Sequence, residues 1–389
     1  MSNSIAFDLP DLKTLVQQLI AKPSVSSVLP EYDSSNQSVV ELLDMWFRTA
    51  GFKTEIQAIA GYPGKYNLIA VKGQGDNGLV LAGHTDTVPF DEQLWQQNPF
   101  QLTERDQRWY GLGTSDMKSF FALILEALRE MDTQQLKAPL IVLATADEES
   151  SMCGARALLD SGKPRARYAV IGEPTGLKPI RMHKGVLMER IAVIGKTGHA
   201  SDPALGHNAI DGVLKVLQAL QQLREQLAKQ YQHPGFEVTT PTLNFGHIHG
   251  GDNPNRICGH CALDIDVRLL PGMAIDETRA LIYQHATLAL ENTPFTIHCE
   301  PLFEGLPAME TSADSALVKA VEQLTGHDAM SVAFGTEAPY FQQMGMDVVI
   351  LGPGDIAVAH QPNEYLRLQN LNPCIDQLRQ LIQRFCIGT

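Results

Sequence analysis

Five residues whose side chains bind metal ions well follow one pattern along the chain. Each lies where a strand is expected to end or a helix to begin, and short apolar runs precede four of them, at 79–82, 140–145, 168–171 and 348–351. Open α/β sheets bind ligands at the carboxyl ends of their strands. Residues far apart in sequence therefore meet at one point if the chain forms such a sheet. The five are His84, Asp116, Glu149, Glu173 and His360.

The pattern between these residues favours an α/β sheet. Apolar residues at helical spacing predict helices, and short apolar or alternating runs predict strands. We expect a mainly parallel sheet covered by helices. The predicted helices are 12–20, 37–49 and 118–131, and the predicted strands include 52–59, 66–72 and 79–83.

The pattern changes in the middle of the chain. Residues 186–300 predict strand, helix, two strands, helix and strand, which is the ferredoxin-like order. At 389 residues, two domains are expected. Because Glu149 and His360 flank the inserted segment, a shared site requires a discontinuous catalytic domain, 1–183 and 303–389, with an inserted α+β lid or dimerisation domain at 184–302.

Composition excludes several classes of protein. The net charge of −14 argues against nucleic-acid binding, which requires a basic surface. No apolar run is long enough to cross a bilayer, so no membrane partner is expected. The N-terminus, residues 1–8, lacks the basic start and apolar stretch of a signal peptide, which predicts a cytoplasmic protein. The six cysteines do not form a disulfide framework.

Each candidate ligand has a simpler interpretation when taken alone. His84 and Asp86 form a His-x-Asp pair in which Asp86 is placed to orient the ring of a metal-bound histidine, but the pair also fits a polar turn. Asp116 fits a helix cap equally well. The tandem acids Asp147-Glu148-Glu149 repel one another unless cations neutralise them or solvent surrounds them.

Together, the two histidines and three carboxylates are enough for two divalent metal ions that share a bridging ligand. The nitrogen and oxygen donors suit zinc, and cobalt or manganese fits as well. We therefore interpret the chain as a dinuclear metallohydrolase. One glutamate of the tandem acids is expected to ligate, and its neighbour to accept a proton from water.

The ordered motifs closely resemble the zinc-dependent aminoacylase/carboxypeptidase family over nearly the whole chain. The resemblance rests on Gly-His84-Thr-Asp86-Thr-Val-Pro, Gly113-Thr-Ser-Asp116-Met-Lys, Asp147-Glu148-Glu149, Gly172-Glu173-Pro-Thr and His360. It implies that His84 and Glu173 hold one metal, that Glu149 and His360 hold the other, and that Asp116 bridges them. It also implies that Glu148 is the general base, that Asp86 supports His84, and that a cis peptide follows Asp116.

The resemblance also assigns roles within the inserted segment. His199 matches the histidine that approaches the substrate carbonyl from the partner subunit of a homodimer, although a surface histidine at a strand end is the simpler interpretation. Asn255 and Arg268 match the region that binds a substrate carboxylate. The pair Cys258 and Cys261 has the spacing of a redox motif but precedes a strand, which argues against a redox role.

A third segment bears on the substrate, which is expected to be a small N-acyl amino acid. Gly335-Thr336-Glu337, with Cys258 and the His360 segment, most resembles the family members that deacetylate N2-acetyl-L-ornithine. Glu337 is expected to receive a cationic side chain or to form a structural hydrogen bond. Desuccinylation of N-succinyl-diaminopimelate and hydrolysis of dipeptides or other acylamino acids are the alternatives.

Overall fold

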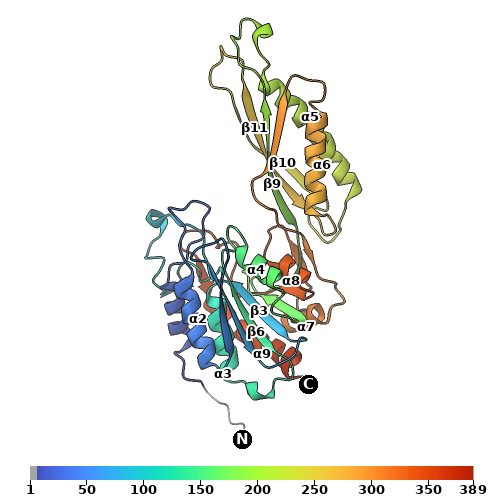
Figure 1. Cartoon of the computed structure of the whole chain (residues 1–389). Coiled ribbons are helices and arrows are strands. Elements are labelled where there is room, and N and C mark those ends of the chain that lie inside the picture. The colour runs from blue at the N-terminus through green and yellow to red at the C-terminus, as the bar shows by residue number, and fades with distance from the viewer. Residues whose placement is uncertain (1–6, 389) are drawn as a thin grey trace. The chain divides into compact units, whose positions relative to one another are not determined.

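The computed structural model describes residues 7–388 and divides the chain into two compact units (Figure 1). The larger unit comprises Met1–Arg181, Thr311–Met330 and Thr336–Thr389, so it is discontinuous. The smaller unit comprises Met182–Glu310 and Ser331–Gly335. Residues 1–6, part of the segment from which a cytoplasmic location was predicted, lie outside the described residues.

A mixed sheet forms the centre of the larger unit. Its four central strands run parallel in the order β6 (Leu140–Thr145), β3 (Leu79–His84), β7 (Tyr168–Ile171) and β15 (Asp347–Ile350). Antiparallel strands flank these four, so the sheet is parallel only at its centre. The flanking strands are β1 (Lys53–Ala58), β2 (Tyr66–Lys72), β8 (Ile180–His183) and β13 (Met309–Glu310), and β14 (Met330–Val332) pairs with β8.

Burial explains why the central strands read as unbroken apolar runs. Every residue of β3 and β6 is buried, because both faces of the sheet are covered. The helices of this unit are α1 (Leu12–Ile20), α2 (Gln37–Thr49), α3 (Ser119–Arg129), α4 (Cys153–Ser161), α7 (Ala316–Thr325), α8 (Ala338–Gln343) and α9 (Leu371–Ile382). Short helical turns lie at Glu92–Leu94, Thr133–Gln135, Leu368–Asn370 and Gln383–Ile387.

Three further strands of the larger unit form a small antiparallel sheet. It has the order β16 (Tyr365–Arg367), β5 (Arg108–Tyr110) and β4 (Thr103–Arg105). β16 follows directly after Glu364, whose side chain is important for the site described below.

The smaller unit has the predicted β-α-β-β-α-β order. Its antiparallel sheet has the spatial order β10 (Thr242–Gly250), β11 (His260–Leu269), β9 (Gly185–Ile194) and β12 (Thr296–Pro301). Buried residues alternate along β11, because one face of the sheet packs on helices α5 (Ala209–Gln230) and α6 (Ile275–Leu288). A short turn of helix lies at Pro203–Leu205. Across the described residues, no helix combines the length and apolar character that a bilayer crossing requires.

Candidate metal centre

The five predicted ligands lie at the carboxyl-terminal edge of the central strands. His84 is the last residue of β3, Glu149 lies in the turn after β6, and Glu173 follows β7. Asp116 lies just ahead of α3. His360 departs from the expected placement, because it lies in a turn well beyond the end of β15 and has a left-handed backbone with φ of 58°.

Asp116 lies between the two histidines. Its Oδ1 atom is 3.0 Å from His84 Nε2, and its Oδ2 atom is 3.4 Å from His360 Nε2. The two oxygens of one buried carboxylate therefore face two different imidazole nitrogens. This is the arrangement that a bridging ligand between two cations requires.

The remaining acids divide between the two histidines. Glu149 Oε1 lies 2.8 Å from His360 Nε2, and Glu173 Oε1 lies 3.8 Å from His84 Nε2. Two overlapping groups, each with ligand atoms within 4.8 Å of one another, have a geometry that can hold a cation. The first contains His84, Asp116 and Glu149, and the second contains His84, Glu148 and Glu173.

Two observations show that this site suits cations. Glu173 Oε1 and Asp86 Oδ1 are buried and accept no hydrogen bond, although buried carboxylate oxygens normally have partners. Carboxylates also outnumber bases there. The buried acids of the region are Asp86, Asp116, Glu148, Glu173, Glu337 and Glu364. The donor set of imidazole nitrogens and carboxylate oxygens is one that zinc binds.

The pKa shifts follow the same excess of negative charge. Burial raises the pKa of Glu148 well above its ordinary value, and the neighbouring Glu149 raises it further against the opposing effect of His84. Burial and Asp116 raise the pKa of Glu173. Hydrogen bonds with Asp116 and Glu149 raise the pKa of His360 to about 10. All three shifts favour the protonated form, because the site has an excess of negative charge, which bound cations would balance.

The loop that presents Asp116 is fixed by Glu364, which the sequence analysis did not single out. The buried Glu364 carboxylate accepts the main-chain N–H groups of Gly113, Ser115 and Asp116 at 2.9, 2.6 and 2.9 Å. The predicted cis peptide between Asp116 and Met117 is confirmed. The only signal for Glu364 in the sequence is its position four residues after His360.

The supporting contacts of His84 differ in detail from the sequence expectation. His84 Nδ1 lies 3.0 Å from the main-chain oxygen of Asp86 and 3.7 Å from its carboxylate. The Asp86 carboxylate instead accepts the main-chain N–H of Glu149 at 3.1 Å. Asp86 therefore joins the end of β3 to the turn of the tandem acids.

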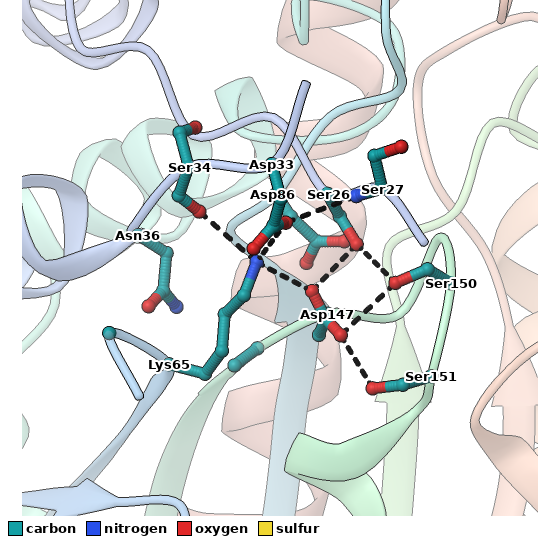
Figure 2. A network of polar contacts seen from close by, with 12 residues as sticks. Ser26, Ser27, Asp33, Ser34, Asn36, Lys65, Asp86, Asp147, Ser150 and Ser151 are labelled. Atoms are coloured by element: carbon teal, nitrogen blue, oxygen red, sulfur yellow. Dashed lines mark hydrogen bonds and ion pairs between the residues drawn. The ribbon is translucent and has the colours of Figure 1, made fainter. Parts of the chain in front are cut away.

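Asp147, the first of the tandem acids, is directed away from the other two. Figure 2 shows its carboxylate among Lys65, Ser26, Ser150 and Ser151. Neither of the cation-binding groups found among the described residues includes it. The family resemblance assigned roles to Glu148 and Glu149, but the sequence indicated neither the direction of Asp147 nor a role for Lys65.

The predicted lid residues lie at opposite ends of the sheet in the smaller unit. His199 follows β9 and pairs with Arg256, which is adjacent to Asn255, and all three side chains are exposed. Arg268 lies near the other end of β11, where it pairs with Val186 and Thr242. Its Nε donates to Asp266 Oδ1 at 2.9 Å. Within one chain, His199 and Arg268 are therefore separated by most of the length of the sheet.

The segment Gly335-Thr336-Glu337 lies where the chain passes from one unit to the other. Gly335 belongs to the smaller unit, and Thr336 and Glu337 belong to the larger unit. Glu337 is 1% exposed, and neither carboxylate oxygen has a hydrogen-bond partner within 3.5 Å. Burial raises its pKa to about 7, although Thr145 and His84 oppose this shift.

Comparison with known proteins places the chain in a family of metallopeptidases. The profile of Peptidase family M20/M25/M40 matches residues 80–384, and the chain belongs to this family. A metallo-carboxypeptidase of the M20 family from Sulfolobus solfataricus has the same fold, with a TM-score of 0.74, 19% identity, and coverage of 97% of this chain and 99% of that one. A Bacillus subtilis protein described as a dinuclear metal binding peptidase from the M20 family aligns with a TM-score of 0.64 and 16% identity over 95% and 96% of the two chains.

A relative with much higher sequence identity is a deacetylase. The acetylornithine deacetylase of Vibrio vulnificus (strain CMCP6) is 47% identical over 378 residues, which cover 97% of this chain and 99% of that protein. The similarity therefore spans both units.

Proposed function

We propose that the chain hydrolyses N2-acetyl-L-ornithine to acetate and L-ornithine in a metal-dependent reaction. The observation that most supports this proposal is Asp116, whose two oxygens face His84 and His360 at 3.0 and 3.4 Å. The identity of 47% to an acetylornithine deacetylase over nearly the full length supports the substrate.

The five ligands divide into two sets in this proposal. His84 and Glu173 hold one divalent ion, Glu149 and His360 hold the other, and Asp116 is shared. Zinc suits these donors, and cobalt or manganese has the same preferences. When bound, such ions acidify a water and polarise a carbonyl oxygen.

Glu148 is the residue that moves the proton. It is 9% exposed, and a carboxylate oxygen lies within 4.8 Å of ligand atoms of His84 and Glu173. We propose that Glu148 accepts the proton of the attacking water as the new C–O bond forms. It then gives this proton to the ornithine nitrogen as the C–N bond breaks, and the net reaction consumes one water.

The smaller unit supports a homodimeric site. Because His199 and Arg268 lie near opposite ends of the sheet, we propose that one copy supplies Arg268 for the substrate carboxylate and the partner copy supplies His199 and Asn255. His199 Nδ1 accepts the Ser201 main-chain N–H at 3.2 Å. The neutral ring therefore has its proton on Nε2, where it can donate to the carbonyl oxygen of the substrate.

Glu337 suits the cationic end of ornithine. A buried carboxylate without a partner is costly, and an ammonium group supplies the missing counter-charge. We include Gly335 and Thr336 with it in the substrate-binding segment. A cytoplasmic location, predicted from the N-terminal sequence, completes the proposal.

The substrate is tested by comparing kcat/KM for N2-acetyl-L-ornithine and N-succinyl-diaminopimelate under identical conditions. The proposal predicts a preference for the acetylated substrate of about 10²-fold or more, because a site that pairs buried polar groups with one substrate discriminates strongly against another. A preference for the succinylated substrate would keep the chemistry and replace the substrate.

A further inference from the structure

The turn of the tandem acids has to point Glu148 and Glu149 into the site while Asp147 points elsewhere. The backbone achieves this at Asp147 itself, which has a left-handed φ of 62°. Aspartate tolerates this conformation better than most residues with a Cβ atom. The surrounding contacts must therefore hold Asp147 in place, and these contacts come from outside the metal centre.

Asp147 is nearly enclosed by donors. Its carboxylate Oδ1 accepts Lys65 Nζ and Ser26 Oγ, each at 2.7 Å, and Oδ2 accepts Ser150 Oγ at 3.0 Å (Figure 2). Its main-chain oxygen accepts the N–H groups of Ser151 and Met152 at 3.1 and 2.7 Å. The residue is 4% exposed.

Lys65 supplies the one positive charge in this network. Its ammonium group donates to Asp33 Oδ1 at 2.6 Å, to Asp147 Oδ1 at 2.7 Å and to the Ser34 main-chain oxygen at 3.1 Å. An ammonium group has three N–H donors, and all three are used. Lys65 is 5% exposed. Burial alone would lower its pKa, but the hydrogen bonds to Asp147 and Asp33 raise it, so the charge is retained.

The same segment that holds Asp147 also holds the end of β3. Ser26 donates its main-chain N–H to Thr87 O at 2.8 Å, and Thr87 donates to Ser24 O at 3.0 Å. His84 lies three residues before Thr87. Residues 24–34 with Lys65 therefore connect the strand end that presents His84 with the turn that presents Glu148 and Glu149.

From these contacts we propose that Lys65 is a positioning residue for Glu148, acting through Asp147. The ammonium group compensates the buried Asp147 carboxylate and fixes the turn, so that Glu148 and Glu149 keep their places before any cation binds. This inference deepens the proposed function and rests on Glu148 being the general base.

The test compares Lys65→Met with Lys72→Met as a matched control. Lys72 ends the same strand β2 whose first residue follows Lys65, and its Nζ donates to a main-chain oxygen, Ala50 O at 2.7 Å, remote in sequence from the tandem acids. We expect Lys65→Met to lower kcat by about 10²-fold, since a displacement of about 1 Å in a catalytic group has that effect. KM should change less than about threefold, because Lys65 contacts no predicted substrate-binding residue. Lys72→Met should retain kcat.

A double variant separates positioning from general damage to the fold. When Lys65→Met is combined with Asp147→Asn, the carboxylate that Lys65 compensates is removed with it, and the amide oxygen introduced at position 147 still accepts from Ser26 Oγ. We expect kcat to recover to within about tenfold of the unmodified chain, because contacting residues are not additive. If Lys65→Met does not fold, Ser26→Ala is the milder variant, because it removes the Ser26 Oγ contacts with Asp147 and Ser150 and leaves Lys65 in place. It should lower kcat about three- to tenfold.

Two readouts do not depend on turnover. Zinc affinity, measured by calorimetry, should weaken in Lys65→Met and not in Lys72→Met. Hydrogen exchange at the Ser151 and Met152 amides should accelerate in the same variant. Unchanged zinc affinity and amide exchange together with unchanged kcat in Lys65→Met would overturn the positioning role. Failure of the unmodified chain to hydrolyse the acetylated substrate would overturn the proposed function instead, because both readouts would still report on the turn.

Discussion

The candidate metal centre and the His199 region of the smaller unit hold their side chains in different ways. His84, Asp116 and Glu173 are buried, and His84 Nε2 lies 3.0 Å from Asp116 Oδ1 and 3.8 Å from Glu173 Oε1. His199 and Asn255 lie in exposed loops, and His199 Nδ1 lies 2.7 Å from Ser201 Oγ, two residues away. The predicted metal ligands therefore lie within the larger unit of one chain, whereas His199 and Asn255 are exposed in the smaller unit. In the proposed function, the larger unit therefore carries the chemistry, and His199 and Asn255 serve the site of a neighbouring copy.

The largest effect should come from Glu148. Glu148→Gln preserves size but cannot accept a proton, so kcat should fall by about 10²- to 10⁴-fold, the usual contribution of a positioned base. Zinc binding, measured by calorimetry, should persist because the five predicted ligands remain. A variant with normal turnover would remove Glu148 from the mechanism, and a variant that loses both ions would make it a ligand.

Mixing two variants tests whether His199 and Arg268 reach one site from different copies of the chain. His199→Ala and Arg268→Ala should each reduce turnover by about 10²-fold in homodimers, since each removes a group that stabilises or binds the reacting substrate. Mixed dimers place both defects in one site and leave the other intact. Random mixing of equal amounts should therefore restore about a quarter of the original activity, given a two-fold symmetric dimer.

No restoration on mixing would show that His199 and Arg268 act on the same site from one chain, or that the subunits do not exchange. Subunit exchange is checked independently by mixing two differently tagged copies of the unmodified chain. An active monomer would contradict the homodimeric site directly.

Glu364 should have a smaller effect that appears in metal affinity. Glu364→Gln retains one acceptor oxygen but cannot accept all three N–H groups of the Asp116 loop. Zinc affinity should weaken about 10- to 100-fold, the usual cost of losing a residue that orients a ligand. Calorimetry on the metal-free protein measures this change. Gln134→Glu, on an exposed turn, serves as a control for the preparation and should bind zinc normally.

The smallest effect concerns the pH dependence of stability at His183, the last residue of β8. His183 is fully buried, and burial lowers its pKa to about 4 from an ordinary value of 6.5. The unfolded chain binds a proton there below pH 6.5 and the folded chain does not, so this histidine reduces stability as the pH falls from 6.5 toward 4. The loss should be about 2 kcal/mol at pH 5.

His183→Asn removes this titration. The difference in unfolding free energy between pH 7.5 and pH 5, measured by urea denaturation, should therefore be smaller in the variant than in the unmodified chain. An identical pH dependence in both proteins would show that His183 is already accessible to protons in the folded state.

Much of the architecture was predictable because burial leaves a direct record in the sequence. The unbroken apolar runs 79–82 and 140–145 became central strands with every residue buried. The β-α-β-β-α-β pattern predicted for residues 186–300 corresponds to the four strands and two helices of the smaller unit. Antiparallel strands at the edges of the larger sheet were not predicted, because a flanking strand such as β2 has an apolar pattern similar to that of a parallel one.

The site was predictable in its residue types but not in its supporting contacts. Ligand motifs placed His84, Asp116 and Glu149 together, whereas Glu364 and Lys65 gave no comparable signal. Glu364 contacts the Asp116 loop although the two residues are 248 positions apart in the sequence. Lys65 matters because the backbone turns left-handed at Asp147 and directs that carboxylate toward it. A run of three acids does not reveal which carboxylate points away.

The most direct test of the account is a zinc titration of metal-free protein in which calorimetry and ornithine release from N2-acetyl-L-ornithine are followed together. Two zinc ions should bind per chain, chelation should abolish turnover, and added zinc should restore it. Asp116→Ala should weaken both binding events, because both ions share this carboxylate. Undiminished turnover in the metal-free protein, or saturation at one ion per chain with full activity, would contradict the shared two-ion site.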